Sequence, residues 1–226
     1  MKVLVLNGSP KAQSDTMHIT NAFLEGLNKK QMHEIKVIKV IEQKIKPCLG
    51  CFNCWQSADI CCIQNDDMQG ILKEIVASDL IIWSFPLYCY GMPSHLKAVC
   101  DRLLPLSNLA MREEEGKVVH ESKVDLSSKK YIMISGCGFP DFEGNFAPAV
   151  AQFKNCFGKE TVTICISEAP MFNVKEAEAV VSPLLEKIKK AGEEYNMTGK
   201  LAQETIKEIE TPMIPNEVYI KNINGQ

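Results

Sequence analysis

The chain has 226 residues, of which 46% are hydrophobic and 23% are charged, so it is long enough to bury the core of one α/β domain with additions. A formal net charge of −3 and a pI near 5.9, with basic residues scattered along the chain, exclude the basic surface that nucleic acids require. No apolar run reaches the length of a transmembrane helix and Met1 leads directly into a predicted strand, so we expect a soluble, cytoplasmic protein with no membrane partner.

The first predicted elements are a buried strand and a helix joined by a hydroxyl-rich loop. The apolar run over residues 3–6 is typical of a strand covered on both faces of a parallel sheet, and the turn over residues 7–10 ends it. The loop before the helix carries three hydroxyl side chains, which belong to Ser9, Ser14 and Thr16. Because a helix N-terminus offers unpaired N–H groups and a positive dipole end, the loop suits a phosphate group. The alternative is an ordinary connection in which Ser14 or Asp15 only caps the helix.

The rest of the chain continues the alternation of strands and helices. Further strands are predicted over residues 34–41, 80–85, 131–135 and 161–166, and further helices over 67–77, 94–104, 146–157 and 174–195. Residues 106–128 have no clear period, and we interpret them as an excursion from the fold, with a solvated surface loop as the alternative. We place a first domain at residues 1–198 and a C-terminal extension at 199–226, with a short helix and then an extended tail from Pro212 and Pro215.

This order predicts an α/β three-layer sandwich with a flavodoxin-like topology. Five parallel strands in the order 2-1-3-4-5 would be covered by helices on both faces, with right-handed crossovers. Ligands of such sheets bind beyond the carboxyl ends of the strands, where the strand order reverses. The loops after the first, third and fourth strands, at residues 8–16, 86–92 and 136–139, should therefore converge on one crevice.

The side chains of this crevice suit a flat heterocycle that bears a phosphate. Tyr88 and Tyr90 offer aromatic surface, while Gly136 and Gly138 admit a close approach of the backbone. FMN has this chemistry, and backbone N–H groups of the third loop can bond its pyrimidine edge. Plain packing of the second loop remains the alternative for the two tyrosines.

Several motifs in the first half of the chain occur together in one known family. They are Gly8-Ser9-Pro10-Lys11 followed by Thr16, Pro47-Cys48-Leu49-Gly50-Cys51-Phe52-Asn53-Cys54-Trp55, Asp66-Asp67-Met68, Ser78-Asp79, Pro86-Leu87-Tyr88 with Pro93, Leu96-Lys97, and Asp101-Arg102. With these motifs in this order, the chain resembles the NAD(P)H-dependent FMN reductases and iron–sulfur flavoproteins of the flavodoxin-like superfamily.

The resemblance implies a noncovalently bound FMN and an oligomer. It implies Ser9, Lys11, Ser14 and Thr16 at the phosphate, and Pro86, Leu87, Tyr88, Cys89, Tyr90 and Gly91 at the ring. It also implies a homodimer or homotetramer with each flavin near a subunit boundary, for which residues 106–128 are the candidate arm. Asp15 departs from the family, whose members often have asparagine there. A carboxylate facing the phosphate would weaken binding unless it turned outward to cap the helix.

Ten cysteines in a chain without a signal peptide favour thiols, metal ligands or redox chemistry over a disulfide framework. Cys48, Cys51, Cys54 and Cys61 have the spacing C-x2-C-x2-C-x6-C, and such closely spaced thiolates can wrap a [4Fe–4S] cluster. The iron–sulfur flavoproteins have a very similar spacing. Many reductases that the chain resembles keep such cysteines as free thiols near the dimer interface, and zinc is a third alternative. All three remain open at this point.

These observations together favour an FMN-dependent oxidoreductase that carries electrons from NADH or NADPH to a quinone, a nitro compound or a free flavin. Because hydride passes between stacked rings, no side-chain acid or base is required, and we assign no catalytic residue. The first alternative is an iron–sulfur flavoprotein that takes electrons from ferredoxin through a [4Fe–4S] cluster to FMN. The second alternative is a non-enzymatic protein with the same fold.

Overall fold

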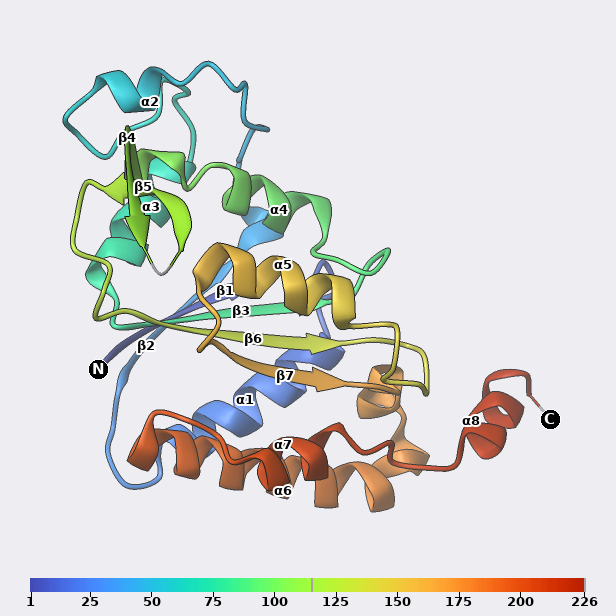
Figure 1. Ribbon diagram of the computed structural model, residues 1–226. Helices are drawn as coiled ribbons and strands as arrows, with labels where there is room; N and C mark the ends of the chain where they lie inside the picture. The colour runs from blue at the N-terminus through green and yellow to red at the C-terminus, as the bar shows by residue number, and fades with distance from the viewer. Residues whose placement is uncertain (115, 226) are drawn as a thin grey trace.

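The computed structural model describes residues 1–114 and 116–225, and its centre is a five-stranded parallel sheet (Figure 1). The strands of this sheet are β1 (Lys2–Asn7), β2 (Glu34–Lys39), β3 (Leu80–Pro86), β6 (Lys130–Gly136) and β7 (Val162–Ile166). They lie in the order β2-β1-β3-β6-β7, and every neighbouring pair is parallel. The predicted α/β class with a parallel sheet is therefore confirmed.

The predicted strand order needs a correction, because two further strands intervene in the chain. β4 (Ser107–Glu114) and β5 (Lys117–Ser122) pair antiparallel and form a separate two-stranded sheet inside the predicted excursion. The order 2-1-3-4-5 did not include them, so the last two strands of the main sheet are β6 and β7. Most side chains of this hairpin are exposed. Neither of its faces is consistently buried, and its sequence therefore shows no alternation of polar and apolar residues.

Helices cover both faces of the main sheet, as Figure 1 shows. One face carries α1 (Asp15–Asn28), α6 (Glu178–Thr198) and α7 (Gln203–Glu210), and the other carries α3 (Met68–Ala77), α4 (Ser94–Asp101) and α5 (Ala147–Phe157). Val3 and Val5 pack in the apolar cluster of the first face, whereas Leu4 and Leu6 pack in that of the second. Successive side chains of a strand point to opposite faces, so a strand buried on both faces reads as an unbroken apolar run.

Two helices are shorter than their sequence patterns predict. α4 ends at Asp101 rather than at residue 104, because Leu104–Leu106 forms a 3₁₀ turn (η2) that contains a proline. The helix predicted over residues 174–195 begins as a 3₁₀ turn at Lys175–Ala177 (η4), and α6 starts only at Glu178. The remaining short helical segments are η1 (Val40–Glu42), α2 (Asn53–Gln56) and η3 (Ala169–Asn173).

The C-terminal segment contains a helix where an extended tail was predicted. α7 corresponds to the short helix expected there, but Asn216–Ile223 forms a further helix, α8. Pro215 immediately precedes the first residue of α8, a position where its fixed φ and missing N–H do not interrupt a helix. Among residues 1–114 and 116–225, no helix combines the length and apolar character that crossing a membrane requires.

Candidate functional site

The loop between β1 and α1 turns back on itself and ends in a capped helix. The backbone N–H of Ser9 donates to Asn7 Oδ1 at 2.9 Å, and Ser9 Oγ accepts from the N–H of Lys11 at 3.3 Å. Ser14 is the N-cap of α1, and its Oγ accepts from the Met17 N–H at 3.1 Å. Capping therefore uses the Ser14 hydroxyl oxygen as an acceptor, and the hydroxyl hydrogen can still be donated to a ligand.

Asp15 does not cap the helix. As a cap it would have turned outward and carried its charge away from the predicted phosphate position. Its Oδ2 lies 2.7 Å from Lys11 Nζ, and its Oδ1 accepts a hydrogen bond from Asn173 Nδ2. The Asp15 side chain is only 13% exposed, so it stays in the loop between these two partners. The positive charge of Lys11 is paired with this carboxylate instead of being free for an anion.

The loop after β3 is a tight turn that displays two tyrosines. Tyr88 and Gly91 exchange both backbone hydrogen bonds, each at 3.0 Å. The two residues between them, Cys89 and Tyr90, have φ values of +47° and +62°, which residues other than glycine rarely adopt. Such strained backbone is concentrated at functional sites. Tyr88 is 46% exposed and Tyr90 is 53% exposed, so neither ring is packed into the core.

The third loop follows β6 and is joined to the second. The N–H of Leu87 donates to the carbonyl oxygen of Gly136 at 2.8 Å. A Cβ atom added at Gly136 would lie 2.8 Å from Ala169 Cβ, so packing within the fold requires this glycine. A Cβ atom at Gly138 would lie 3.6 Å from Pro170 Cγ, which is an ordinary contact.

The three loops lie at the carboxyl ends of β1, β3 and β6, which are neighbours in the sheet. His95 adds a link that the sequence analysis did not identify, since its Nε2 lies 2.8 Å from the carbonyl oxygen of Gly8. Thr16 is 1% exposed and its Oγ1 lies 3.7 Å from the Cβ position of Gly136, so the first and third loops also meet. These contacts join the first loop to the elements that follow β3 and β6, and a single crevice formed by all three loops stays a prediction.

The cysteine segment, residues 47–65, lies near the hairpin, and four of its cysteines line one small cavity. The cavity has a volume of about 20 Å³, and its cysteines are Cys48, Cys51, Cys54 and Cys62. Cys61 does not line it, because its Sγ faces the Ser57 hydroxyl at 3.4 Å. Three of the four predicted cysteines thus line one cavity together with Cys62, and Cys61 does not line it.

Two side chains fix the cysteine segment to the base of the hairpin. Lys123 Nζ donates to the carbonyl oxygens of Cys54 at 2.5 Å and Ser57 at 2.7 Å. Trp55 Nε1 donates to the carbonyl oxygen of Leu104 at 3.1 Å, and its ring centroid lies 4.6 Å from that of His120. The hairpin and the cysteines thus form one unit.

The thiols have the chemistry of cluster ligands, but within the described residues they do not form a metal-binding group. In the described part of the chain, no group of three or more His, Cys, Asp or Glu side chains could hold a metal ion. Burial, together with the neighbouring Cys62, raises the pKa of the Cys54 thiol. Four soft sulfur donors on one turning loop match what an iron–sulfur cluster needs, and binding one would require the loop to draw them inward.

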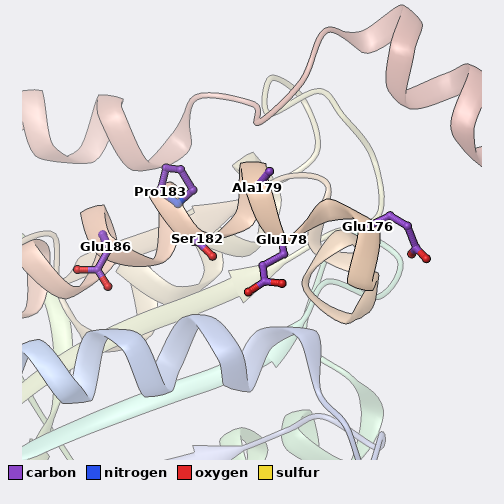
Figure 2. Close-up of a pocket in the computed structure, with 6 residues that line it drawn as sticks. All are labelled: Glu176, Glu178, Ala179, Ser182, Pro183 and Glu186. Carbon is purple, nitrogen blue, oxygen red and sulfur yellow. The ribbon is translucent and has the colours of Figure 1, made fainter.

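A surface depression of about 680 Å³ lies away from both of these places (Figure 2). Its lining comes from η4 and α6 and consists of Glu176, Glu178, Ala179, Ser182, Pro183 and Glu186. Figure 2 shows the three carboxylates spread along this surface. A shallow acidic depression without a glycine-rich loop repels phosphate, so we do not assign the flavin to it.

Comparison with known proteins supports the family that the motifs indicate. An iron–sulfur flavoprotein of Methanosarcina thermophila is 33% identical over 118 residues, which are 51% of this chain and 60% of the relative. FMN-dependent NADH:quinone oxidoreductase 2 of Idiomarina loihiensis is 28% identical over 110 residues, which are 45% of each chain. The chain thus spans about half the length of the curated relatives it matches.

The fold of the whole chain is shared more widely. An azoreductase from Bacillus anthracis superposes with a TM-score of 0.64 at 17% identity, and the match covers 86% of this chain and 99% of that one. Residues 1–196 match the model of a family described as flavodoxin-like fold. Since this match extends over the whole sheet and both helical layers, the chain belongs to that flavodoxin-like family.

Proposed function

We propose that this protein is an FMN-dependent oxidoreductase that takes electrons from NADH or NADPH and passes them to a quinone, a nitro compound or a free flavin. The observation that carries the proposal is the meeting of three loops at the carboxyl ends of β1, β3 and β6. They bring together a helix N-terminus, two exposed tyrosines and a loop with backbone donors. The name of one relative, FMN-dependent NADH:quinone oxidoreductase 2, agrees with this assignment.

The residues present fit FMN in their chemistry. The N-terminus of α1 offers backbone N–H groups and a positive dipole end for the phosphate, beside Ser9, Lys11, Ser14 and Thr16. The loop that runs from Pro86 through Gly91 would border the flavin ring. Gly138 of the third loop would border the pyrimidine edge of that ring. We propose these residues as the binding site.

When bound, FMN supplies the hydride and electron chemistry, and the side chains bind and orient it. The exposed turn over Tyr88 and Tyr90 gives a flat surface on which a second aromatic ring can lie. Rings held in this way would need no protein acid or base, because hydride passes directly between them and the protein contributes their orientation. We therefore assign no catalytic residue.

The test is a titration of the purified chain with FMN, followed by NADH or NADPH under anaerobic conditions. We expect quenching of flavin fluorescence on binding, bleaching of the flavin band near 450 nm by one of the two nicotinamides, and recovery of the band when a quinone is added. A protein that takes up no FMN would contradict the proposal and favour the non-enzymatic alternative. A flavin that binds but is not reduced by either nicotinamide would favour reduction by ferredoxin.

A second candidate function follows from the cysteine cavity. We propose as the alternative that Cys48, Cys51, Cys54 and Cys62 hold a [4Fe–4S] cluster that passes electrons from ferredoxin to FMN. The similarity to iron–sulfur flavoproteins supports it. Anaerobic reconstitution should then give about four irons per chain. C62S should lose the iron while C61S keeps it, and equal iron in wild type and C62S would contradict this ligand set.

We also propose that the protein is a homodimer or homotetramer. The hairpin presents apolar side chains to solvent, with Leu109 64%, Met111 59% and Val118 71% exposed. Exposed apolar side chains gathered on one protruding element are typical of protein interfaces. Light scattering at micromolar concentration should give a multiple of the 25.3 kDa chain mass, and L109S/V118S should shift it toward the monomer. A monomeric wild type would contradict the proposal.

A further inference from the structure

The C-terminal segment lies outside the family match and yet reaches the candidate flavin site. The match ends at residue 196, whereas α7 and α8 follow it. Figure 1 shows α8 at the end of the sheet where the arrowheads of β6 and β7 lie. Because ligands of this fold bind at that end, an added segment placed there bears on the site.

Two contacts attach this segment to the loops that follow β6 and β7. Glu168 is fully buried, and its Oε2 accepts a hydrogen bond from the backbone N–H of Met213 at 2.5 Å. Asn216 Nδ2 donates to Asp141 Oδ1 at 2.6 Å. These contacts hold the start of α8 against the loops that follow β6 and β7.

The third contact reaches the third loop itself. Tyr219 of α8 is only 4% exposed, and its hydroxyl donates to the carbonyl oxygen of Gly138 at 2.7 Å. The peptide that follows is planar and trans, so the Phe139 N–H points away from the Gly138 carbonyl and thus away from Tyr219. Tyr219 therefore sets the direction of a backbone donor that it does not touch.

That donor is free within the described residues. Neither the Gly138 N–H nor the Phe139 N–H makes a hydrogen bond to any part of residues 1–114 and 116–225, although the Phe139 carbonyl accepts from the Glu168 N–H at 3.0 Å. Backbone donors are normally paired or exposed to a partner in solution. The loop is thus held from the α8 side while its two N–H groups are left for another acceptor.

We propose that Tyr219 is a positioning residue for the flavin: it fixes the Gly138–Phe139 peptide so that the Phe139 N–H bonds the pyrimidine edge of FMN. This inference rests on the proposed function. A donor at that edge stabilises the negative charge of reduced flavin more than the neutral oxidised ring, so its orientation affects both the affinity and the reduction potential. The added segment would then adjust the redox properties of a common site.

The test compares Y219F with Y195F, which makes the same chemical change in a tyrosine that is 5% exposed and packs against Phe23 of α1. We expect Y219F to raise the FMN dissociation constant about 3- to 10-fold, as loss of one orienting hydrogen bond predicts. We also expect its flavin reduction potential to become more negative. Y195F should match wild type in both measurements, and circular dichroism should show both variants folded.

Hydrogen exchange of the apo protein separates this inference from the proposed function. Exchange of the buried Glu168 amide, whose N–H donates to the Phe139 carbonyl oxygen at 3.0 Å, should become faster in Y219F and not in Y195F, because the loop is no longer held. If wild type binds FMN and Y219F changes neither the affinity, the potential nor the exchange, the inference is wrong while the proposed function stands. If wild type takes up no FMN, the proposed function and the flavin role of Tyr219 both fail. Faster exchange in Y219F would then show only that Tyr219 anchors the loop.

Discussion

Arg102 and Asp66 form an almost fully buried ion pair, with Arg102 Nη1 2.5 Å from Asp66 Oδ2 and side chains that are 1% and 3% exposed. The same Nη1 donates to the carbonyl oxygen of Lys46 at 3.1 Å. Lys46 precedes the cysteine segment and Asp66 follows it, so one guanidinium closes both ends of this segment. Arg102 also lines the cysteine cavity.

Removal of this guanidinium should destabilise the protein strongly. R102M leaves the Asp66 carboxylate buried without its cation, and we expect the free energy of unfolding at pH 7 to fall by about 3–5 kcal/mol. The matched control is K97M on α4, the helix that Arg102 follows, because the Lys97 ion pair with Asp101 is exposed and should contribute less than about 1 kcal/mol. Urea denaturation measures both. Equal losses in the two variants would show that the buried pair has no special role.

Glu210 at the end of α7 should make stability depend on pH. Burial raises the pKa of this carboxyl from 4.5 to about 7 in the folded chain. The folded state therefore binds more protons than the unfolded state between these values, and the free energy of unfolding falls as pH rises through this range. The stabilisation is fully present below pH 4.5 and is lost by about pH 7. Because the side chain is partly exposed, we expect a change of only about 1–2 kcal/mol.

Urea denaturation of E210Q at pH 5 and pH 8 tests this origin. The amide cannot ionise, so E210Q should gain stability relative to wild type at pH 8 and differ little at pH 5. Glu208 lies on the exposed side of the same helix, and E208Q should show no such pH-dependent difference. A constant difference between E210Q and wild type at the two pH values would assign the effect to packing.

Much of the fold was predictable because burial on both faces leaves a clear signal. The apolar runs at residues 3–6 and 80–85 became β1 and β3, whose alternate side chains enter the two core clusters. The hairpin has no buried face along most of its length, and α8 contributes only Tyr219 to the interior. Elements of this kind lack the periodicity on which a prediction from sequence depends.

The candidate site was likewise predictable only in part. Its loops were predictable because the carboxyl ends of parallel strands meet at one edge. The contacts that orient the loops were not, since Asn173 lies 158 residues from Asp15 and Tyr219 lies 81 residues from Gly138. Local patterns carry no information on such pairs. The packing role of Gly136 was equally hidden, because it depends on Ala169 of a later segment.

Neutralising Asp15 should strengthen FMN binding. D15N removes a negative charge from the first loop and frees Lys11 for the phosphate, while its amide oxygen can still accept from Asn173. We expect the FMN dissociation constant to fall about 3- to 10-fold at low salt, with a smaller effect at 0.3 M salt. Riboflavin lacks the phosphate and serves as the matched ligand, so its affinity should not change. Tighter binding of both ligands would locate the effect at the ring instead.

Cys156 of α5 should be the thiol that reacts most readily near neutral pH. A hydrogen bond from the Cys100 thiol of α4 lowers the pKa of Cys156 to about 7, and the ammonium group of Lys97 favours the thiolate further. Because the thiolate is the reactive form, alkylation of Cys156 by iodoacetamide should reach half its maximal rate near pH 7. C100A removes the hydrogen bond and should move this midpoint toward 9, as mass spectrometry of the labelled peptide can measure. Buried Cys165 is the internal control and should stay unlabelled in the folded protein. A midpoint that stays near 7 in C100A would assign the activation of Cys156 to Lys97 alone.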